Sequence, residues 1–352
     1  MEIKNIVLQN KIPKRAEGLD ILKCLCAFMI ICIHCPFSGV FGEYFIALTR
    51  IAVPIFFIIT VFFYISIVNK KRELLQIRKI VGLMIFSNLL YAFWKSLKAF
   101  ASGIEVIDYW RSVINIENII KFIFLNESPF NFHLWYLGAV LYVLIIMYFV
   151  RWLHIERILF LVTPLLLVMD LVLGKYSLLI LGREFPYLIV RNFLFVGIPY
   201  FMIGKFLSMH WKEDGKWIKE IIIIGIFIFS ITTLLERYLL VKTELNTTRD
   251  HYFSTTFLAI AVFLLFLIEF PHNQNNRLEI TAAKIGREYS TGIYVIHPIV
   301  ITILSSIMKK VGFYRLYSLI APFAVFIVSI LIMIAVISTI NLLKRLMGKQ
   351  EL

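Results

Sequence analysis

Residues 18–38 read GLDILKCLCAFMIICIHCPFS, an apolar run that contains Asp20, Lys23 and His34. About 20 apolar residues in α-helical form are long enough to cross a hydrocarbon core of roughly 30 Å. Residues 1–17 before the run are polar and basic, and no small-residue cleavage site follows it. We therefore expect an uncleaved transmembrane helix that is preceded by a cytoplasmic lead, residues 1–17.

Apolar runs of this kind recur along the whole chain. Hydrophobic residues make up 60% of the 352 positions and charged residues only 16%, whereas a soluble domain usually carries roughly 25% charged residues. We expect an all-α membrane protein, a polytopic bundle of about ten transmembrane helices that forms a single domain over residues 1–352. The predicted helices lie at 18–38, 45–67, 78–99, 134–151, 157–174, 189–208, 217–235, 253–270, 289–308 and 316–342.

The distribution of lysine and arginine predicts the orientation. Clusters occur at Lys70-Lys71-Arg72 and Arg78-Lys79, whereas residues 39–46 contain neither residue type. Because cytoplasmic connections are enriched in Lys and Arg, both termini are predicted to be cytoplasmic. These clusters, facing anionic membrane lipid, also account for the net charge of +14, so nucleic acid is not an expected partner.

Residues 100–133 form one long connection on the outer face in this topology. Isoleucines recur in it at helical spacing, at positions 116, 119, 120 and 123. The pattern predicts a helix that lies in the membrane interface. It fits a lid over the outer mouth of the bundle and an ordinary interfacial loop helix equally well.

All four cysteines lie in the first apolar run, at Cys24, Cys26, Cys32 and Cys35. Pairs on one helix make poor disulfides, and Cys32-Ile33-His34-Cys35 would need further ligands to hold a metal. We expect small packing thiols and no metal site.

A charged side chain in the middle of a membrane costs roughly 2.5–3.5 kcal/mol on insertion scales, so Lys23 and Asp20 require a reason. Lys23 and His34 are eleven positions apart, which returns within about 20° of the same helix face after a rise of about 16 Å. Asp20 lies one turn before Lys23 and can pair with it. We therefore expect one polar stripe that joins the cytoplasm to a deep imidazole.

Polar and charged groups also occur within or at the ends of other predicted helices, and their convergence predicts a water-accessible cavity. They are Arg50, His133, Trp135, Arg191, Tyr294 and His297. The structural alternatives are snorkelling of the cations, hydrogen-bonded packing of the histidines, and an aromatic belt for the tryptophan.

Four segments, in this order along nearly the whole chain, resemble the membrane acyltransferase-3 family. They are Asp20-Ile21-Leu22-Lys23 with His34 after ten further residues, Val53-Pro54-Ile55-Phe56-Phe57, His133-Leu134-Trp135-Tyr136-Leu137, and Tyr294-Val295-Ile296-His297-Pro298. The resemblance implies an O-acyltransferase of the bacterial cytoplasmic membrane. Such enzymes move an acyl group, usually acetyl, from cytoplasmic acetyl-CoA to a hydroxyl of an envelope carbohydrate or glycolipid, with no bound cofactor.

Two departures from the family pattern stand out. The family's basic residue, usually arginine, corresponds to Lys23, and its Ser-Gly pair corresponds to Thr60-Val61. The lysine form is similar to a subset that includes the membrane half of vancomycin-resistance serine racemases, for which a substrate-uptake role has been entertained. Lysine would bind phosphate as a point charge rather than as a bidentate fork.

Site roles follow from the resemblance and the helix geometry. The catalytic residues are expected to be His34, Lys23 and Asp20, with His34 acting as general base or acyl carrier. Lys23, Arg15 and Lys14 are expected to bind the phosphates of acyl-CoA. The acceptor or the oxyanion is expected to lie against Arg50, His133, Trp135, Arg191, Tyr294 and His297.

Two other functions are compatible with the residues. One is a carrier without chemistry for a small polar substrate such as serine, although matching Gly/Pro-interrupted helices are missing from the two halves. The other is a polysaccharide-export subunit, although the chain has no nucleotide-binding P-loop. A homo-oligomer is compatible with the sequence.

Overall fold

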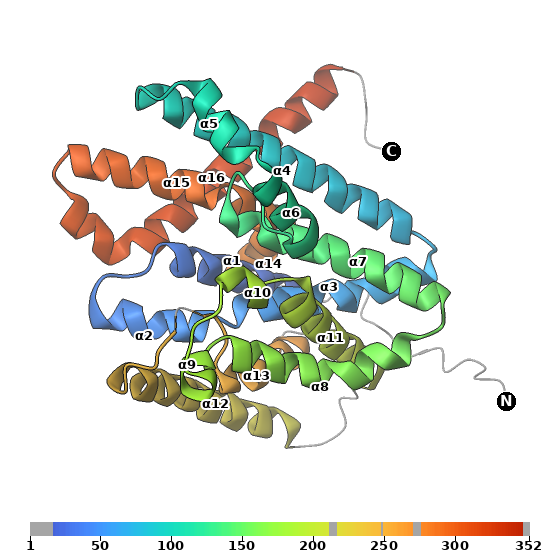
Figure 1. The fold of residues 1–352 in the computed structure, drawn as a ribbon. Helices are drawn as coiled ribbons and strands as arrows, with labels where there is room; N and C mark the ends of the chain where they lie inside the picture. The colour runs from blue at the N-terminus through green and yellow to red at the C-terminus, as the bar shows by residue number, and fades with distance from the viewer. Residues whose placement is uncertain (1–16, 211–216, 248, 270–275, 348–352) are drawn as a thin grey trace. The chain divides into compact units, whose positions relative to one another are not determined.

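The computed structural model describes residues 17–210, 217–247, 249–269 and 276–347, and these residues form helices and connections without strands (Figure 1). The helices are α1 (Glu17–His34), α2 (Gly39–Thr49), α3 (Ala52–Asn69), α4 (Glu73–Ala101), α5 (Val106–Val113), α6 (Ile116–Leu125), η1 (Phe132–Leu134), α7 (Trp135–Trp152), α8 (Glu156–Leu173), α9 (Ser177–Leu181), α10 (Tyr187–Val190), η2 (Phe193–Gly197), α11 (Ile198–His210), α12 (Ile218–Lys242), α13 (Phe253–Glu269), α14 (Arg277–Lys284), η3 (Ile285–Tyr289), α15 (Ser290–Lys310) and α16 (Tyr314–Leu346).

Seven helical segments of the described residues are long and apolar enough to cross a membrane. They are Gly39–Asn69, Glu73–Ala101, Phe132–Trp152, Tyr187–His210, Ile218–Lys242, Arg277–Lys310 and Tyr314–Leu346. The expectation of an all-helical, multi-pass membrane protein is therefore confirmed.

The remaining predicted spans fall on α1, α8 and α13, which are also helical. Two of them contain charged residues within the predicted span, namely Asp20 and Lys23 in α1 and Asp170 in α8. The third, α13, has only 17 residues. Their crossing of the membrane, and the cytoplasmic position of the termini, stay predictions.

The helices group into two compact units. The first unit comprises residues 1–52, 209–228 and 260–352, and the second comprises residues 53–208 and 229–259, each as far as the structure describes them. The first unit therefore joins the beginning of the chain to its end.

In the first unit, α1 packs against α2, α14, η3, α15 and α16. Helix α1 ends at His34 because Pro36 disfavours helical backbone at the preceding residue. This end comes four residues earlier than predicted. Helices α15 and α16 form a hairpin, which turns at Gly312 with a φ of 78°.

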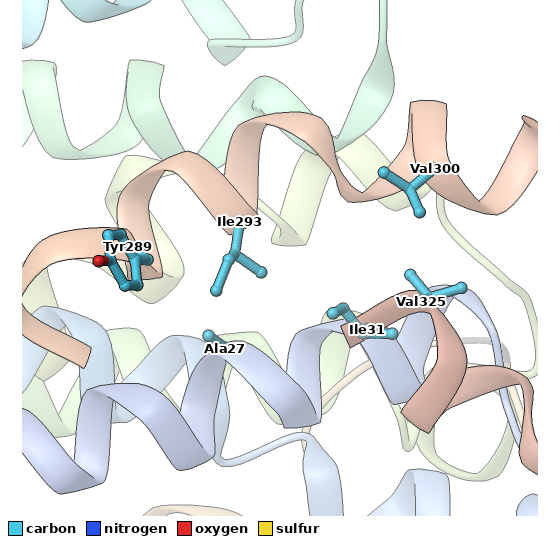
Figure 2. Close-up of a cluster of buried hydrophobic side chains, with 6 residues drawn as sticks. All are labelled: Ala27, Ile31, Tyr289, Ile293, Val300 and Val325. Carbon is cyan, nitrogen blue, oxygen red and sulfur yellow. The ribbon is translucent and has the colours of Figure 1, made fainter. Parts of the chain in front are cut away.

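The core of the first unit lies between α1 and the last helices (Figure 2). Ala27 of α1 faces Tyr289 and Ile293, while Ile31 lies near Val325 of α16. These contacts are apolar, so burial of α1 against the end of the chain stabilises this unit through the hydrophobic effect.

One close backbone approach fixes the position of α1 in this unit. A Cβ atom on Gly286 would lie 1.8 Å from the carbonyl oxygen of Asp20, so only glycine fits in η3 at this crossing.

The predicted second helix, 45–67, is interrupted. Helix α2 ends at Thr49, and α3 begins at Ala52. Pro54 has no N–H to donate to the carbonyl of Arg50, which explains why the helix breaks at Arg50-Ile51.

In the second unit, α7 packs against α4 and η2, and η2 also contacts α8. The long connection 100–133 contains α5 and α6, and α6 is the predicted helix with exposed isoleucines, including Ile116 and Ile123. Its role as a lid stays a prediction.

A second break interrupts the predicted helix 189–208. Helix α10 ends at Val190, and the next helical turn begins at Phe193. The side chain of Asn192 accepts hydrogen bonds from the N–H groups of Leu194 and Phe195, at 2.9 and 3.1 Å. Asn192 therefore caps the new helix, as Asn typically does at an N-cap.

Candidate active site

A cluster of charged side chains lies near the start of α1. The ammonium of Lys23 donates a 2.9 Å hydrogen bond to the buried carboxylate of Asp20. The other carboxylate oxygen lies 3.9 Å from a guanidinium nitrogen of Arg287 in η3. Two cations thus share the carboxylate of Asp20, and Arg287 also donates to the carboxylate of Glu288 at 3.2 Å.

Two histidines meet at the opposite end of α1. The ring of His34 lies 5.1 Å from the ring of His297 in α15, measured between centroids. His34 is half-buried, whereas His297 has no exposed surface. The structure therefore brings together two of the residues that the sequence singled out.

The proline after His297 determines its tautomer. Pro298 has no N–H for the carbonyl of Tyr294, and His297 Nδ1 lies 2.8 Å from that oxygen and 3.1 Å from the carbonyl oxygen of Ile293. A carbonyl oxygen only accepts, so Nδ1 carries the hydrogen and donates. In the neutral ring, the basic lone pair is then on Nε2.

The charged cluster and the histidine pair connect the same two segments of chain. Asp20 and His34 lie on α1, and Arg287 and His297 follow in the same order on η3 and α15. The two segments therefore run parallel. Lys23 and His34 are separated by about 16 Å along α1, at 1.5 Å per residue.

The stripe of α1 between these two ends is apolar. Ala27 and Ile30 occupy the face that Lys23 and His34 share, and their exposed fractions are only 1% and 4%. A continuous polar stripe from Lys23 to His34 was therefore a wrong prediction. Small and aliphatic side chains instead pack this part of the helix.

Tyr294 and Arg50 also belong to the first unit. The Tyr294 ring is buried, with its centroid 6.2 Å from that of His297. Arg50 is half-buried at the break that follows α2. Lys14 and Arg15 lie outside the described residues.

His133, Trp135 and Arg191 belong to the second unit. His133 is buried and contacts the edge of Tyr91, with ring centroids 4.9 Å apart. The guanidinium carbon of Arg191 lies 5.4 Å from the ring centroid of Trp135. The structure thus brings Trp135 and Arg191 together.

Sequence reasoning missed several charged residues. Arg287 was not singled out, although it stands ten positions before His297 and two positions before the predicted helix 289–308. In the second unit, His251 Nδ1 lies 2.7 Å from the carboxylate of Asp170, and both residues are buried. Asp170 within a predicted span was the available signal for this pair.

The described residues contain no group of three or more His, Cys, Asp or Glu side chains that could hold a metal ion. The four cysteines are free thiols, two of them buried.

Comparison with known proteins adds one finding. The family model of the acyltransferase domain, acyltransferase-3, matches residues 17–341. No curated protein and no solved structure matches the chain.

The matched region includes all four segments on which the resemblance was based, and it extends over nearly the whole chain. The family resemblance is therefore confirmed, while the relationship to the lysine-type subset stays a prediction. This chain belongs to the acyltransferase-3 family of membrane acyltransferases.

Proposed function

We propose that this membrane acyltransferase transfers an acetyl or similar acyl group from acyl-CoA to a hydroxyl of a cell-envelope carbohydrate or related acceptor. The observation that carries the proposal is the contact between His34 and His297, on a helix whose other end places Lys23 and Arg287 beside Asp20. The proposal includes a bacterial plasma membrane with cytoplasmic termini, as the charge distribution predicts.

His34 acts as the general base in this proposal. Its imidazole removes the proton of the acceptor hydroxyl, and the oxygen attacks the carbonyl carbon of the thioester. The tetrahedral intermediate then expels the thiolate of CoA, which takes the proton from the imidazolium. An ester and free CoA result, and proton transfer of this kind contributes typically 10²–10⁴-fold to the rate.

His297 is a positioning residue for His34. Its Nδ1 is held by backbone carbonyls, which fixes the ring orientation and leaves the basic nitrogen at Nε2. A neighbouring imidazole with a fixed tautomer can orient the ring of His34 so that a ring nitrogen is available to remove the proton of the substrate hydroxyl.

In this proposal, Lys23 and Arg287 of the charged cluster at the start of α1 bind the phosphates of acyl-CoA. Arg287 supplies the planar guanidinium fork that Lys23 does not have, and it lies across Asp20 from Lys23. Lys14 and Arg15 are proposed to add charge to this site. Because Ala27 and Ile30 fill the stripe above Lys23, the proposal does not send the thioester arm along that stripe.

A thioester-turnover assay tests the proposal directly. The purified protein in lipid nanodiscs is given acetyl-CoA and a carbohydrate acceptor mixture, and the release of free CoA is measured. His34→Gln should lower this release by about 100-fold or more. The matched control is His210→Gln, an exposed histidine at the end of α11, which should behave as wild type.

Both variants must reach the membrane in equal amounts, as measured by in-gel fluorescence of a C-terminal tag. Unchanged CoA release by a well-folded His34→Gln protein would remove the assigned base. Failure of the wild type to turn over acetyl-CoA, together with uptake of a small polar substrate into vesicles, would replace the enzyme by a carrier.

A further inference from the structure

Arg191 of the second unit lies inside a group of aromatic rings. Its guanidinium carbon is 4.2 Å from the ring centroid of Tyr187, 5.4 Å from that of Trp135 and 5.6 Å from that of Phe132. Trp135 is buried, and Arg191 itself is half-buried. Aromatic faces stabilise a guanidinium by cation–π attraction, but they do not accept its hydrogen bonds in the way a carboxylate does.

The charge of Arg191 is not neutralised by the described residues. It forms no ion pair with them, and its buried Nε has no hydrogen-bond partner among them. A buried donor without an acceptor is costly, because the group has lost its water. The same donor becomes favourable when an anionic ligand supplies the acceptor.

A second cation strengthens this argument. The guanidinium of Arg249 lies 5.1 Å from the centroid of the same Tyr187 ring. Unlike Arg191, it donates to the carbonyl of Phe185 and lies 3.7 Å from the carboxylate of Glu184. Two guanidinium groups therefore lie against the same tyrosine ring, and of the two it is Arg191 that forms no ion pair with the described residues.

The backbone around Arg191 is held in place. Asn192 caps η2, as described above, and its side-chain amide donates to the carbonyl of Ile189 at 2.7 Å. Asn126 donates to the carbonyl of Trp135 at 3.0 Å and accepts from the N–H of Phe193 at 3.1 Å. These bonds fix Arg191 and Trp135 relative to each other, so the group of rings is preorganised for a ligand.

We propose that Arg191, with Tyr187 and Trp135 as its walls, forms a binding site for a phosphate group. The guanidinium donates two parallel hydrogen bonds to phosphate oxygens, the geometry in which arginine binds this group most strongly. The part of the ligand beside the phosphate packs on the aromatic rings. This site goes beyond the proposed acyl transfer and does not depend on it.

Binding to the full-length protein in maltoside detergent tests the site with two probes. Inorganic phosphate is titrated by microscale thermophoresis, and phosphatidylglycerol is titrated by native mass spectrometry against phosphatidylcholine as the reference lipid. Arg191→Gln should weaken binding of at least one probe by about 10- to 100-fold, the effect of losing hydrogen bonds to a charged group. A loss for phosphatidylglycerol alone identifies a lipid headgroup, and a loss for inorganic phosphate identifies a soluble or substrate phosphate.

Arg183→Gln is the matched control. Arg183 is an exposed arginine of the same unit that lies 4.7 Å from the ring centroid of Phe185, so the same charge is removed without touching the site. It should change affinity by less than about twofold. Equal effects of both substitutions would show general electrostatic attraction and overturn the site.

Arg191→Lys keeps the test decisive if Arg191→Gln does not fold. Lysine retains the charge but has no planar fork, so affinity should still fall by about fivefold or more. A folded Arg191→Lys protein that binds both probes as tightly as wild type would overturn the proposal.

Discussion

Pro298 lacks the N–H that would bond the Tyr294 carbonyl, and His297 Nδ1 donates to that oxygen instead. One imidazole thus closes a gap in its own helix and contacts His34 with the same ring. In a membrane helix such a gap has no water to fill it. The proline and the histidine therefore act as a pair, and the contribution of His297 to folding has to be separated from its contribution to chemistry.

Two substitutions at His297 make that separation. Asn can still donate to the Tyr294 carbonyl but has no basic ring nitrogen, so His297→Asn should keep its melting temperature and lower CoA release by about 10-fold. His297→Ala should lower CoA release similarly and also destabilise the fold by about 1–3 kcal/mol, because the carbonyl loses its donor. Thermal unfolding and CoA release, measured on both, check this. Full CoA release by a folded His297→Asn protein would argue for a purely structural histidine.

Arg287→Gln tests the charged cluster at the start of α1. Loss of the fork should raise the KM for acetyl-CoA by about 10-fold and leave kcat within about twofold, because phosphate binding is remote from the reacting carbonyl. Arg277→Gln is the control, since Arg277 is an exposed arginine at the start of α14. A fall in kcat without a change in KM would place Arg287 elsewhere in the cycle.

At the scale of elements, α1 depends on a glycine in the neighbouring segment. A Cβ on Gly286 would meet the backbone of Asp20 and of Cys24, which cannot rotate away. A Cβ on Gly292 would meet only the side chain of Met333, at 2.3 Å, and that side chain is flexible. These two glycines of the same helical segment thus face obstacles of different kinds.

Gly286→Ala should therefore destabilise the protein by about 1–3 kcal/mol or more, the range for overpacking a close contact. Gly292→Ala should have a clearly smaller effect, because Met333 can adopt another rotamer. The measurement is the melting temperature of both variants in the same detergent. Equal melting temperatures would show that α1 and η3 separate more easily than the close approach indicates.

The features that depend on residues close together in the sequence could be predicted from the sequence. The Lys23–Asp20 pair follows from a spacing of three residues on one helix, and the membrane helices follow from long apolar runs. The breaks at Arg50 and Arg191 were missed because apolar residues flank them on both sides, although Pro54 signalled the first. Arg287 was missed because its partner Asp20 is far away in sequence, and such pairing is set by the packing of α1 at Gly286.

At the scale of the whole molecule, the number of membrane crossings decides the orientation. If α1, α8 and α13 cross in addition to the seven segments that meet the length and apolarity criteria, both termini lie on the same side. If only the seven cross, the termini lie on opposite sides. Helix α1 contains Asp20 and Lys23, and α8 contains Asp170; charged residues inside a membrane span usually face a functional interior.

Cysteine labelling distinguishes the two topologies. In a variant whose four cysteines are replaced by alanine or serine, single cysteines are placed at the exposed residues Lys70, Ser112, Thr243 and Arg277. A membrane-impermeant maleimide added to intact cells should label positions 112 and 243 and should label 70 and 277 only after lysis. Labelling of only one of positions 112 and 243 in intact cells would contradict the crossing by α8, which lies between them. Labelling of 243 and 277 on the same side would contradict the crossing by α13, which lies between those two positions.

The parallel course of α1 and the η3–α15 segment has a mechanical consequence. The two helical segments have little freedom to slide past each other. Their backbones are in close contact at Gly286, and their aliphatic side chains pack together as far as Ile31. A ligand that binds Lys23 in place of Asp20, at the start of α1, would tilt both helical segments together. This tilt would move the imidazoles of His34 and His297 at the far end. Binding of acyl-CoA near Lys23 and the position of the base His34 would then be coupled by the movement of rigid helices rather than by a continuous channel.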